Sequence, residues 1–84
     1  MSARVDPEMA VLLSGDPGQQ IEAIISAQGR LDDLLDHLPD GVEIQHQYRL
    51  IGSISVSASA GTLRRVADMQ AVKSIEPVRR VSHC

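Results

Sequence analysis

Two stretches of alternating side chains, joined by a glycine, constrain the fold of this chain more than any other feature. From 42 to 50 the even positions hold Val42, Ile44, His46, Tyr48 and Leu50, whereas the odd positions are polar. From 53 to 59 serines hold the odd positions, and the even positions are Ile54, Val56 and Ala58. A period of two predicts two strands, each with one buried face and one wet face. Ile51-Gly52-Ser53 predicts the turn of a hairpin between them.

The residues after the hairpin predict a helix and a final strand. Ser59 is a good N-cap, and a helix is expected from Gly61 to Ala71. Its buried face is expected to hold Leu63, Val66, Ala67 and Met69. The final strand is expected over 72–81, with Val72, Ile75, Val78 and Val81 as its apolar residues. Pro77 interrupts this strand, and because proline has no N–H to donate, the strand is expected at a sheet edge.

The residues before the hairpin predict one strand and one long helix. The apolar run Met9–Leu13 ends at Ser14-Gly15 and predicts a central strand, while Pro7 predicts that residues 1–8 are a loose lead-in. Asp16-Pro17 predicts a helix start. Apolar residues with helical spacing follow at positions 21, 24, 25, 31, 34, 35 and 38. Gly29 lies inside this pattern and leaves open a kinked helix or two shorter ones.

The predicted order of elements, β-α-β-β-α-β, indicates one α+β domain over residues 1–84. Short, right-handed connections favour the ferredoxin-like sandwich, a four-stranded antiparallel sheet with two helices on one face. The first and third strands are then central. The face without helices carries Ser, Gln, Arg and Glu side chains, so it is either wet or a polar docking surface. A tail of about residues 78–84 is expected to extend from the domain.

Composition argues against several classes of function. Tyr48 is the only aromatic residue, so a platform that stacks nucleic-acid bases is not expected. Residues 1–60 carry three Arg against nine acidic residues, and residues 61–84 carry five basic residues against two acidic ones. Five bases on a chain of net charge −3 do not predict a nucleic-acid partner. No apolar stretch approaches the roughly 20 residues that span a bilayer. As written the chain is expected to be cytoplasmic, or secreted if trimmed from a precursor.

No set of catalytic or metal-binding residues stands out. One cysteine and three scattered histidines lack the spacing of a metal site, and no cofactor motif is present, so neither a metal nor a cofactor is expected. The alternating serines have no evident base to activate a nucleophile, so an enzyme is not expected. His46 is expected to be a half-buried histidine on the apolar face of its strand. Cys84 is either part of a frayed terminus or an exposed thiol for an intermolecular disulfide.

The second half of the chain resembles the propeptide inhibitor domain of subtilisin-like serine proteases. The resemblance rests on Tyr48-Arg49-Leu50-Ile51-Gly52-Ser53-Ile54-Ser55-Val56, the helix with Leu63, and Val72-Lys73-Ser74-Ile75-Glu76-Pro77. It covers residues 42–81, about half the chain. The chain departs from the family in its first strand, which lacks the usual aromatic and Lys residues, and in the long segment from Asp16 to Asp40. No protease sequence is attached.

The resemblance implies a protein that inhibits a subtilisin-like serine protease and also assists its folding. In the family the open face of the sheet packs on the enzyme, and the carboxyl-terminal tail enters the active-site cleft like a bound product. Here the matching tail is Val81, Ser82, His83 and Cys84, with Cys84 beside the catalytic serine and Val81 in the apolar pocket. The supporting interface would comprise Glu76, Tyr48 and Val78, with Glu76 acting as a helix cap or salt-bridge partner on the enzyme.

Two other functions fit the same predicted topology. One is a regulatory module similar to the ACT domain, which would dimerise through its sheet edge or its helices and bind a ligand at the interface. The other is a carrier that presents the terminal Cys84 peptide to a modifying enzyme. The inhibitor hypothesis expects a monomer, or at most a weak homodimer, that forms a 1:1 complex with a protease.

Overall fold

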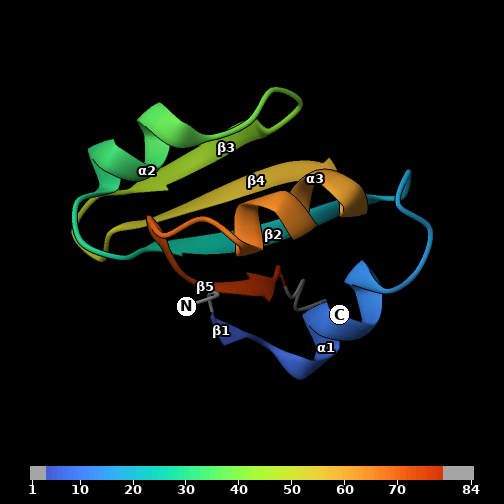
Figure 1. Ribbon diagram of the computed structural model, residues 1–84. Coiled ribbons are helices and arrows are strands. Elements are labelled where there is room, and N and C mark those ends of the chain that lie inside the picture. Colours follow the sequence, from blue (N-terminus) through green and yellow to red (C-terminus); the bar gives the residue numbers. More distant parts are fainter. Residues whose placement is uncertain (1–3, 79–84) are drawn as a thin grey trace, which may run out of the picture.

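The computed structural model describes residues 4–78 as five strands and three helices (Figure 1). In chain order they are β1 (Arg4–Val5), α1 (Pro7–Leu13), β2 (Gln20–Ala27), α2 (Leu31–His37), β3 (Glu43–Tyr48), β4 (Ser53–Ser59), α3 (Ala60–Ala67) and β5 (Val72–Pro77). The strands form one mixed sheet in the order β1-β5-β2-β4-β3, in which β1 is parallel to β5 and the other pairs are antiparallel. The fold is therefore α+β, as predicted, but the sheet has five strands rather than four.

The first apolar run is a helix, so the prediction of a central strand at Met9–Leu13 is wrong. Pro7 is the first residue of α1, where its missing N–H has no helical partner to lose. The Asp6 carboxylate caps the helix by accepting a hydrogen bond from the Glu8 N–H at 2.9 Å. Met9 and Leu13, one turn apart, are buried. The short run was compatible with a strand or a helix, and the Asp6-Pro7 pair decides for the helix.

The second Asp-Pro pair begins a turn, so the prediction of a helix at Asp16-Pro17 is also wrong. The Asp16 side chain accepts from the Gly18 N–H at 2.9 Å, and its carbonyl accepts from the Gln19 N–H at 3.0 Å. Glycine at position 18 favours this turn over a helix. The chain then enters β2, whose buried residues alternate as Ile21, Ala23 and Ile25.

Gly29 marks the boundary between a strand and a helix rather than a kink. Its φ of 91° is a conformation that glycine adopts readily and other residues rarely do. The helix that follows, α2, has only seven residues and buries Leu31 and Leu34. Of the long predicted helix, only this carboxyl-terminal part is helical.

The hairpin and the helix after it are present as predicted, but the expected buried face of the first hairpin strand is wrong, because β3 spans only Glu43–Tyr48 and all six of its residues are exposed. Gly52, with a φ of 63°, lies in the turn between β3 and β4. Ser59 is the N-cap of α3, and its hydroxyl accepts from the Thr62 N–H at 3.2 Å. The buried residues of α3 include Leu63, Val66 and Ala67 as expected, although the helix ends at Ala67 and not at Ala71.

The last strand is not an edge strand, because β1 covers part of its outer side. β1 pairs only with Ser74 and Ile75 of β5. The Val78 N–H donates to the Glu22 carbonyl of β2 at 3.1 Å. The backbone N–H and C=O groups of successive strand residues point to opposite neighbouring strands, so the nitrogen of Pro77 points away from β2. On that side β1 pairs only with Ser74 and Ile75 and does not reach Pro77. The proline is therefore tolerated where the edge is locally free.

All three helices cover the same face of the sheet. Ile25 lies between Ile54 of β4 and Ile75 of β5, and all three are at most 1% exposed. The buried residues of α1, α2 and α3 join the same core cluster, and α1 packs against α3 and β5 (Figure 1). Full burial of one such aliphatic side chain contributes about 1.5–3 kcal/mol. The core therefore occupies one side of the sheet.

Candidate functional site

The side of the sheet opposite the helices is the candidate functional surface, and we call it the open face. Successive residues of a strand point to opposite sides of the sheet, so the residues of the open face alternate along each strand with those that point toward the helices. The residues of the open face are Glu43, His46 and Tyr48 of β3, Ser53, Ser55 and Ser57 of β4, Gln20, Glu22, Ile24 and Ser26 of β2, and Ser74 and Glu76 of β5. Within residues 4–78 no helix lies over this face.

Strand register arranges these side chains in rows across the sheet. One row runs Tyr48, Ser53, Ser26, Ser74, and the next runs His46, Ser55, Ile24, Glu76. In each row a small side chain on β4 lies beside a ring on β3. Adjacent strands are about 4.8 Å apart, so Tyr48 and the β5 end of its row are separated by roughly 14 Å. The side chains at the centre of the open face are therefore mostly short, and larger side chains border them.

A bulge in β3 brings the two rings to this face. Ile44 pairs with Val56, whose side chain points into the core, but the next pairing is His46 with Ser55 because of a register shift. An extra residue in one strand reverses the alternation beyond it. The prediction that His46 is half-buried on the apolar face is therefore wrong: His46 is exposed on the open face, and its ring centroid lies 6.2 Å from that of Tyr48.

Two of the serines are buried, which corrects the prediction of a uniformly wet serine face. Ser53 is 4% exposed and Ser55 is 5% exposed. The Ser53 hydroxyl lies 3.0 Å from the Ser26 hydroxyl, so the two form a hydrogen bond across the strands. The Ser55 hydroxyl is buried without a hydrogen-bond partner among the described residues. Buried hydroxyls normally have a partner, so Ser55 is the least satisfied polar group of the open face.

The pair His46 and Ser55 does not form a nucleophile. The sequence showed no base near the serines, whereas the structure places His46 directly across from Ser55. The Ser55 oxygen nevertheless makes no hydrogen bond to the ring and is closed to solvent. An activated serine needs a base within hydrogen-bond reach and room for a substrate. His46 and Ser55 therefore do not have the geometry of an activated serine.

The predicted supporting residues lie on or beside the open face. Glu76 and Tyr48 are exposed there, on β5 and β3 respectively. Val78 lies at the end of β5, held to β2 by its hydrogen bond to Glu22. The predicted tail residues Val81, Ser82, His83 and Cys84 lie outside the described residues.

The sequence did not predict that Ile24 and Ser26 belong to this surface, because both were assigned to a helix. A signal was present in the alternation of Gln20, Glu22 and Ser26 with apolar residues at 21, 23 and 25. Ile24 breaks the polar side of that alternation, and its adjacency to Ile25 favoured a helical stripe instead. On the open face Ile24 is the central apolar residue, half-buried between Ser55 and Glu76.

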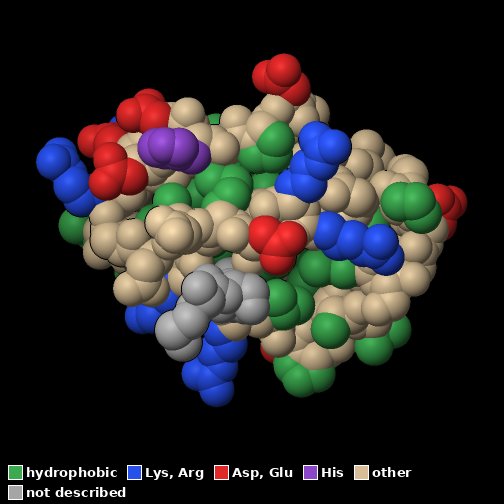
Figure 2. All heavy atoms as spheres, in the orientation of Figure 1, with side chains coloured by type: hydrophobic (Ala, Val, Ile, Leu, Met, Phe, Trp, Pro, Cys, Tyr) green, Lys and Arg blue, Asp and Glu red, His purple; other side chains and the backbone are tan. Residues whose placement is uncertain are grey.

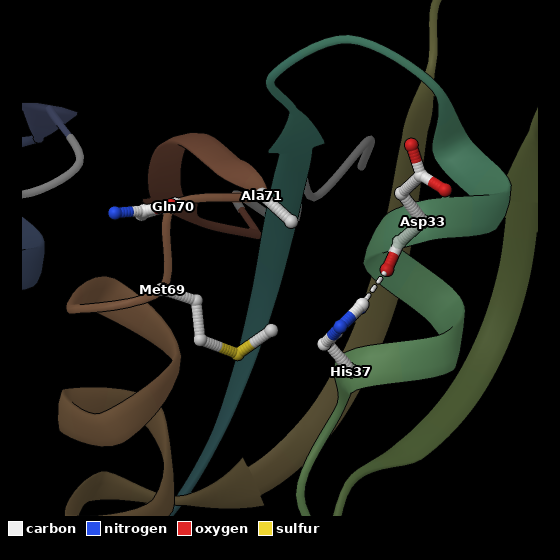
Figure 3. A pocket seen from close by; sticks show the side chains of 5 residues that line it. All are labelled: Asp33, His37, Met69, Gln70 and Ala71. Atoms are coloured by element: carbon white, nitrogen blue, oxygen red, sulfur yellow. Dashed lines mark hydrogen bonds between the residues drawn. The ribbon is translucent and has the colours of Figure 1, made fainter.

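On the opposite side of the sheet, which the helices cover, acidic and basic side chains lie over different helices, and there is a cavity. Acidic side chains and a histidine gather over α2, and basic side chains lie over α3 (Figure 2). A cavity of about 460 Å³ is lined by Asp33, His37, Met69, Gln70 and Ala71. The Met69 side chain extends toward His37, whose Nδ1 lies 2.7 Å from the Asp33 carbonyl (Figure 3). The polar groups that line the cavity do not point toward one common position (Figure 3), so the cavity by itself does not indicate a ligand.

Within residues 4–78, no three His, Cys, Asp or Glu side chains are arranged to hold a metal ion. No helix in the same range is long and apolar enough to cross a membrane. Compared with protein-family models, curated proteins and solved structures, the chain matches none of them. The resemblance to propeptide inhibitor domains therefore stays a prediction from the sequence, and the open face is the structural feature on which a function can be argued.

Proposed function

We propose that this protein binds and inhibits a subtilisin-like serine protease by packing its open face on the enzyme. In this proposal β2, α2, β3, β4, α3 and β5 form a ferredoxin-like core, and β1 and α1 are additions at its amino-terminal end. The strand order β5-β2-β4-β3 supports it, since the first and third strands of that core are central. The carboxyl-terminal tail would enter the active-site cleft.

The observation that carries the proposal is the character of the open face. Its central side chains are short, and two of its serines are as inaccessible as core residues. Ile24 gives the centre an apolar contact, and Tyr48, His46 and Glu76 border it. Tyrosine is enriched in protein–protein interfaces, and the rims of such interfaces are polar. The face therefore suits a broad protein partner better than a small ligand.

The position of Val78 supports the role of the tail. The β2–β5 pairing continues from Ile24–Glu76 to Ala23–Pro77 and ends with the bond from Val78 to Glu22. The carboxyl-terminal segment therefore starts at one end of the open face, beside Glu22. An extended segment gains main-chain hydrogen bonds when it pairs with a strand of its partner. A segment anchored to a folded domain also loses less entropy on binding than a free peptide does.

Inhibition of a broad-specificity subtilisin tests the proposal. We expect the full chain to inhibit, and a chain ending at Arg80 to inhibit at least about tenfold less, a difference of about 1.4 kcal/mol in binding. If the truncated chain inhibits equally well, the tail does not enter the cleft.

A matched pair of charge reversals tests the docking surface. Glu76→Lys changes the open face, whereas Asp36→Lys makes the same change on exposed α2. We expect Glu76→Lys to weaken inhibition and Asp36→Lys to leave it unchanged. Equal effects of the two substitutions, with both chains folded by circular dichroism, would rule out the open face as the docking surface.

A further inference from the structure

Among residues 4–78, no strand pairs with the outer side of β3. It is the outer strand on its side of the sheet, and all six of its residues are exposed. The other edge of the sheet is formed by the two-residue β1, beyond which the outer side of β5 carries Pro77. β3 contains neither proline nor lysine, which often block edge pairing, although it carries a bulge between Ile44 and His46. Its outward N–H and C=O groups are therefore open to another strand.

Exposed apolar side chains gather at the same edge. Among residues 4–78 the exposed large hydrophobic residues are Val11, Ile44, Tyr48, Leu50 and Ile51. All but Val11 lie on β3 or at the tip of its hairpin, where Leu50 is fully exposed and Ile51 is 72% exposed. Apolar side chains that cluster on a surface mark an interaction site more reliably than scattered ones.

We propose that two copies of this chain associate through β3, antiparallel, about a two-fold axis between Gln45 and His46. This register places Glu43 opposite Tyr48 of the second copy, and both side chains lie on the open face. It also places Ile44 opposite Gln47, and both lie on the helical side. Directly opposed residues of an antiparallel pair must share a face, and the bulge at Ile44/His46 allows this register to satisfy that condition.

The hairpin tips also gain a partner in this arrangement. Continuing the register places Leu50 and Ile51 beside residues 40–41 of the second copy, next to its half-buried Leu38, Pro39 and Val42. Like charges are not opposed anywhere along the paired strands. A six-residue strand pair with two hairpin tips is smaller than a standard stable interface of about 1,200–2,000 Å², so the dimer is weak.

The dimer goes beyond the proposed inhibitory function, and of the residues that border the proposed docking surface it involves His46 and Tyr48 but not Glu76. Pairing at β3 leaves Ile24 and Glu76, and the start of the tail at Val78, uncovered in both copies. The two open faces become neighbouring parts of one extended sheet. An inhibitor assay and an association assay therefore fail or succeed separately.

Sedimentation equilibrium of the full chain tests the association. From about 10 µM to about 1 mM we expect the average mass to rise from 9.1 kDa toward twice that value. Over the same range, hydrogen exchange should slow at amides of 43–48 and stay constant in α1. A monomer mass at every concentration overturns the proposal.

Opposite charges at one position test the register. Tyr48→Glu opposes Glu43 of the second copy with a like charge, whereas Tyr48→Lys opposes it with an opposite charge. We expect the dimer dissociation constants of the two variants to differ by about tenfold, with Tyr48→Lys the tighter, since two symmetric pairs contribute. The double variant Tyr48→Glu/Glu43→Lys should restore association.

Val11→Glu adds the same charge on exposed α1 and should associate like the unaltered chain. Circular dichroism establishes that each variant is folded. Equal dissociation constants for Tyr48→Glu and Tyr48→Lys, or no recovery in the double variant, overturn the proposed pairing.

Discussion

The unpartnered hydroxyl of Ser55 gives a prediction in which two neighbouring serines should respond with opposite signs. Ser53 and Ser55 lie on the same strand, point to the same face and are equally buried. Ser53 has a hydrogen-bond partner in Ser26, and Ser55 has none among the described residues. We expect Ser55→Ala to raise the free energy of unfolding and Ser53→Ala to lower it.

The expected sizes follow from the two environments. A buried hydroxyl without a partner costs about 1–3 kcal/mol, and its removal relieves that penalty. The lower strand propensity of alanine subtracts a few tenths of a kcal/mol, which leaves a gain of about 1–2 kcal/mol for Ser55→Ala. Ser53→Ala removes a hydrogen bond with a net value of about 0.5–1.5 kcal/mol and leaves Ser26 without that partner. The two variants should therefore differ by about 2–3 kcal/mol.

Urea unfolding followed by circular dichroism measures both free energies under the same conditions. A gain of 1 kcal/mol should also raise the melting temperature by about 4–8 °C in a domain of this size. If Ser55→Ala loses as much stability as Ser53→Ala, the Ser55 hydroxyl has a partner in solution and the reasoning fails. If both variants are neutral, the two serines are solvated rather than buried.

Three further stability predictions concern the elements that position the open face. Met9→Ala should lower the free energy of unfolding by about 2–5 kcal/mol, because Met9 is fully buried. A loss of less than about 1 kcal/mol in urea unfolding would show that α1 is not part of the core. Ser59→Ala should cost about 0.5–2 kcal/mol by removing the cap of α3, and Ser59→Asp, which can also cap, should cost less by the same measurement. Gly52→Val should destabilise the hairpin more than Gly52→Asn in thermal melts, because the positive φ at this turn suits Asn better than a β-branched residue; the reverse order would contradict the turn conformation.

The hairpin and α3 were predictable because their signals agree locally. Serine alternation, the turn at Gly52 and the cap at Ser59 each favour the same element boundaries. Strict alternation of serine with apolar residues over 53–59 fits a period of two and not the helical period. The order and type of these elements could be predicted without tertiary information.

The amino-terminal third was ambiguous for a physical reason. Met9–Leu13 is too short to show a period, and residues 21, 24 and 25 fit a helical stripe as well as 21, 23 and 25 fit a strand. The two Asp-Pro pairs have the same local preference, yet only Asp6-Pro7 begins a helix. Asp16 instead accepts from the Gly18 N–H in a turn, and pairing of β2 between β4 and β5 decides for the strand.

The composition of the open face could not be deduced from alternation alone. The bulge after Ile44 places His46 and Tyr48 on the open face instead of the helical side. No residue type in the sequence predicts this bulge. The burial of Ser53 and Ser55 likewise does not follow from the alternation, which predicts that they face water. An uncovered face was predicted, but not that it holds His46, Tyr48 and the buried Ser55 hydroxyl without a hydrogen-bond partner.

The most direct test of the open face as a binding surface is a chemical-shift map of the ¹⁵N-labelled chain titrated with a catalytically inactive subtilisin. We expect the largest changes at Ile24, Ser55 and Glu76, and none at Val11 or elsewhere on α1. Changes confined to the helical side, or no change with the enzyme in excess, would contradict the proposed function.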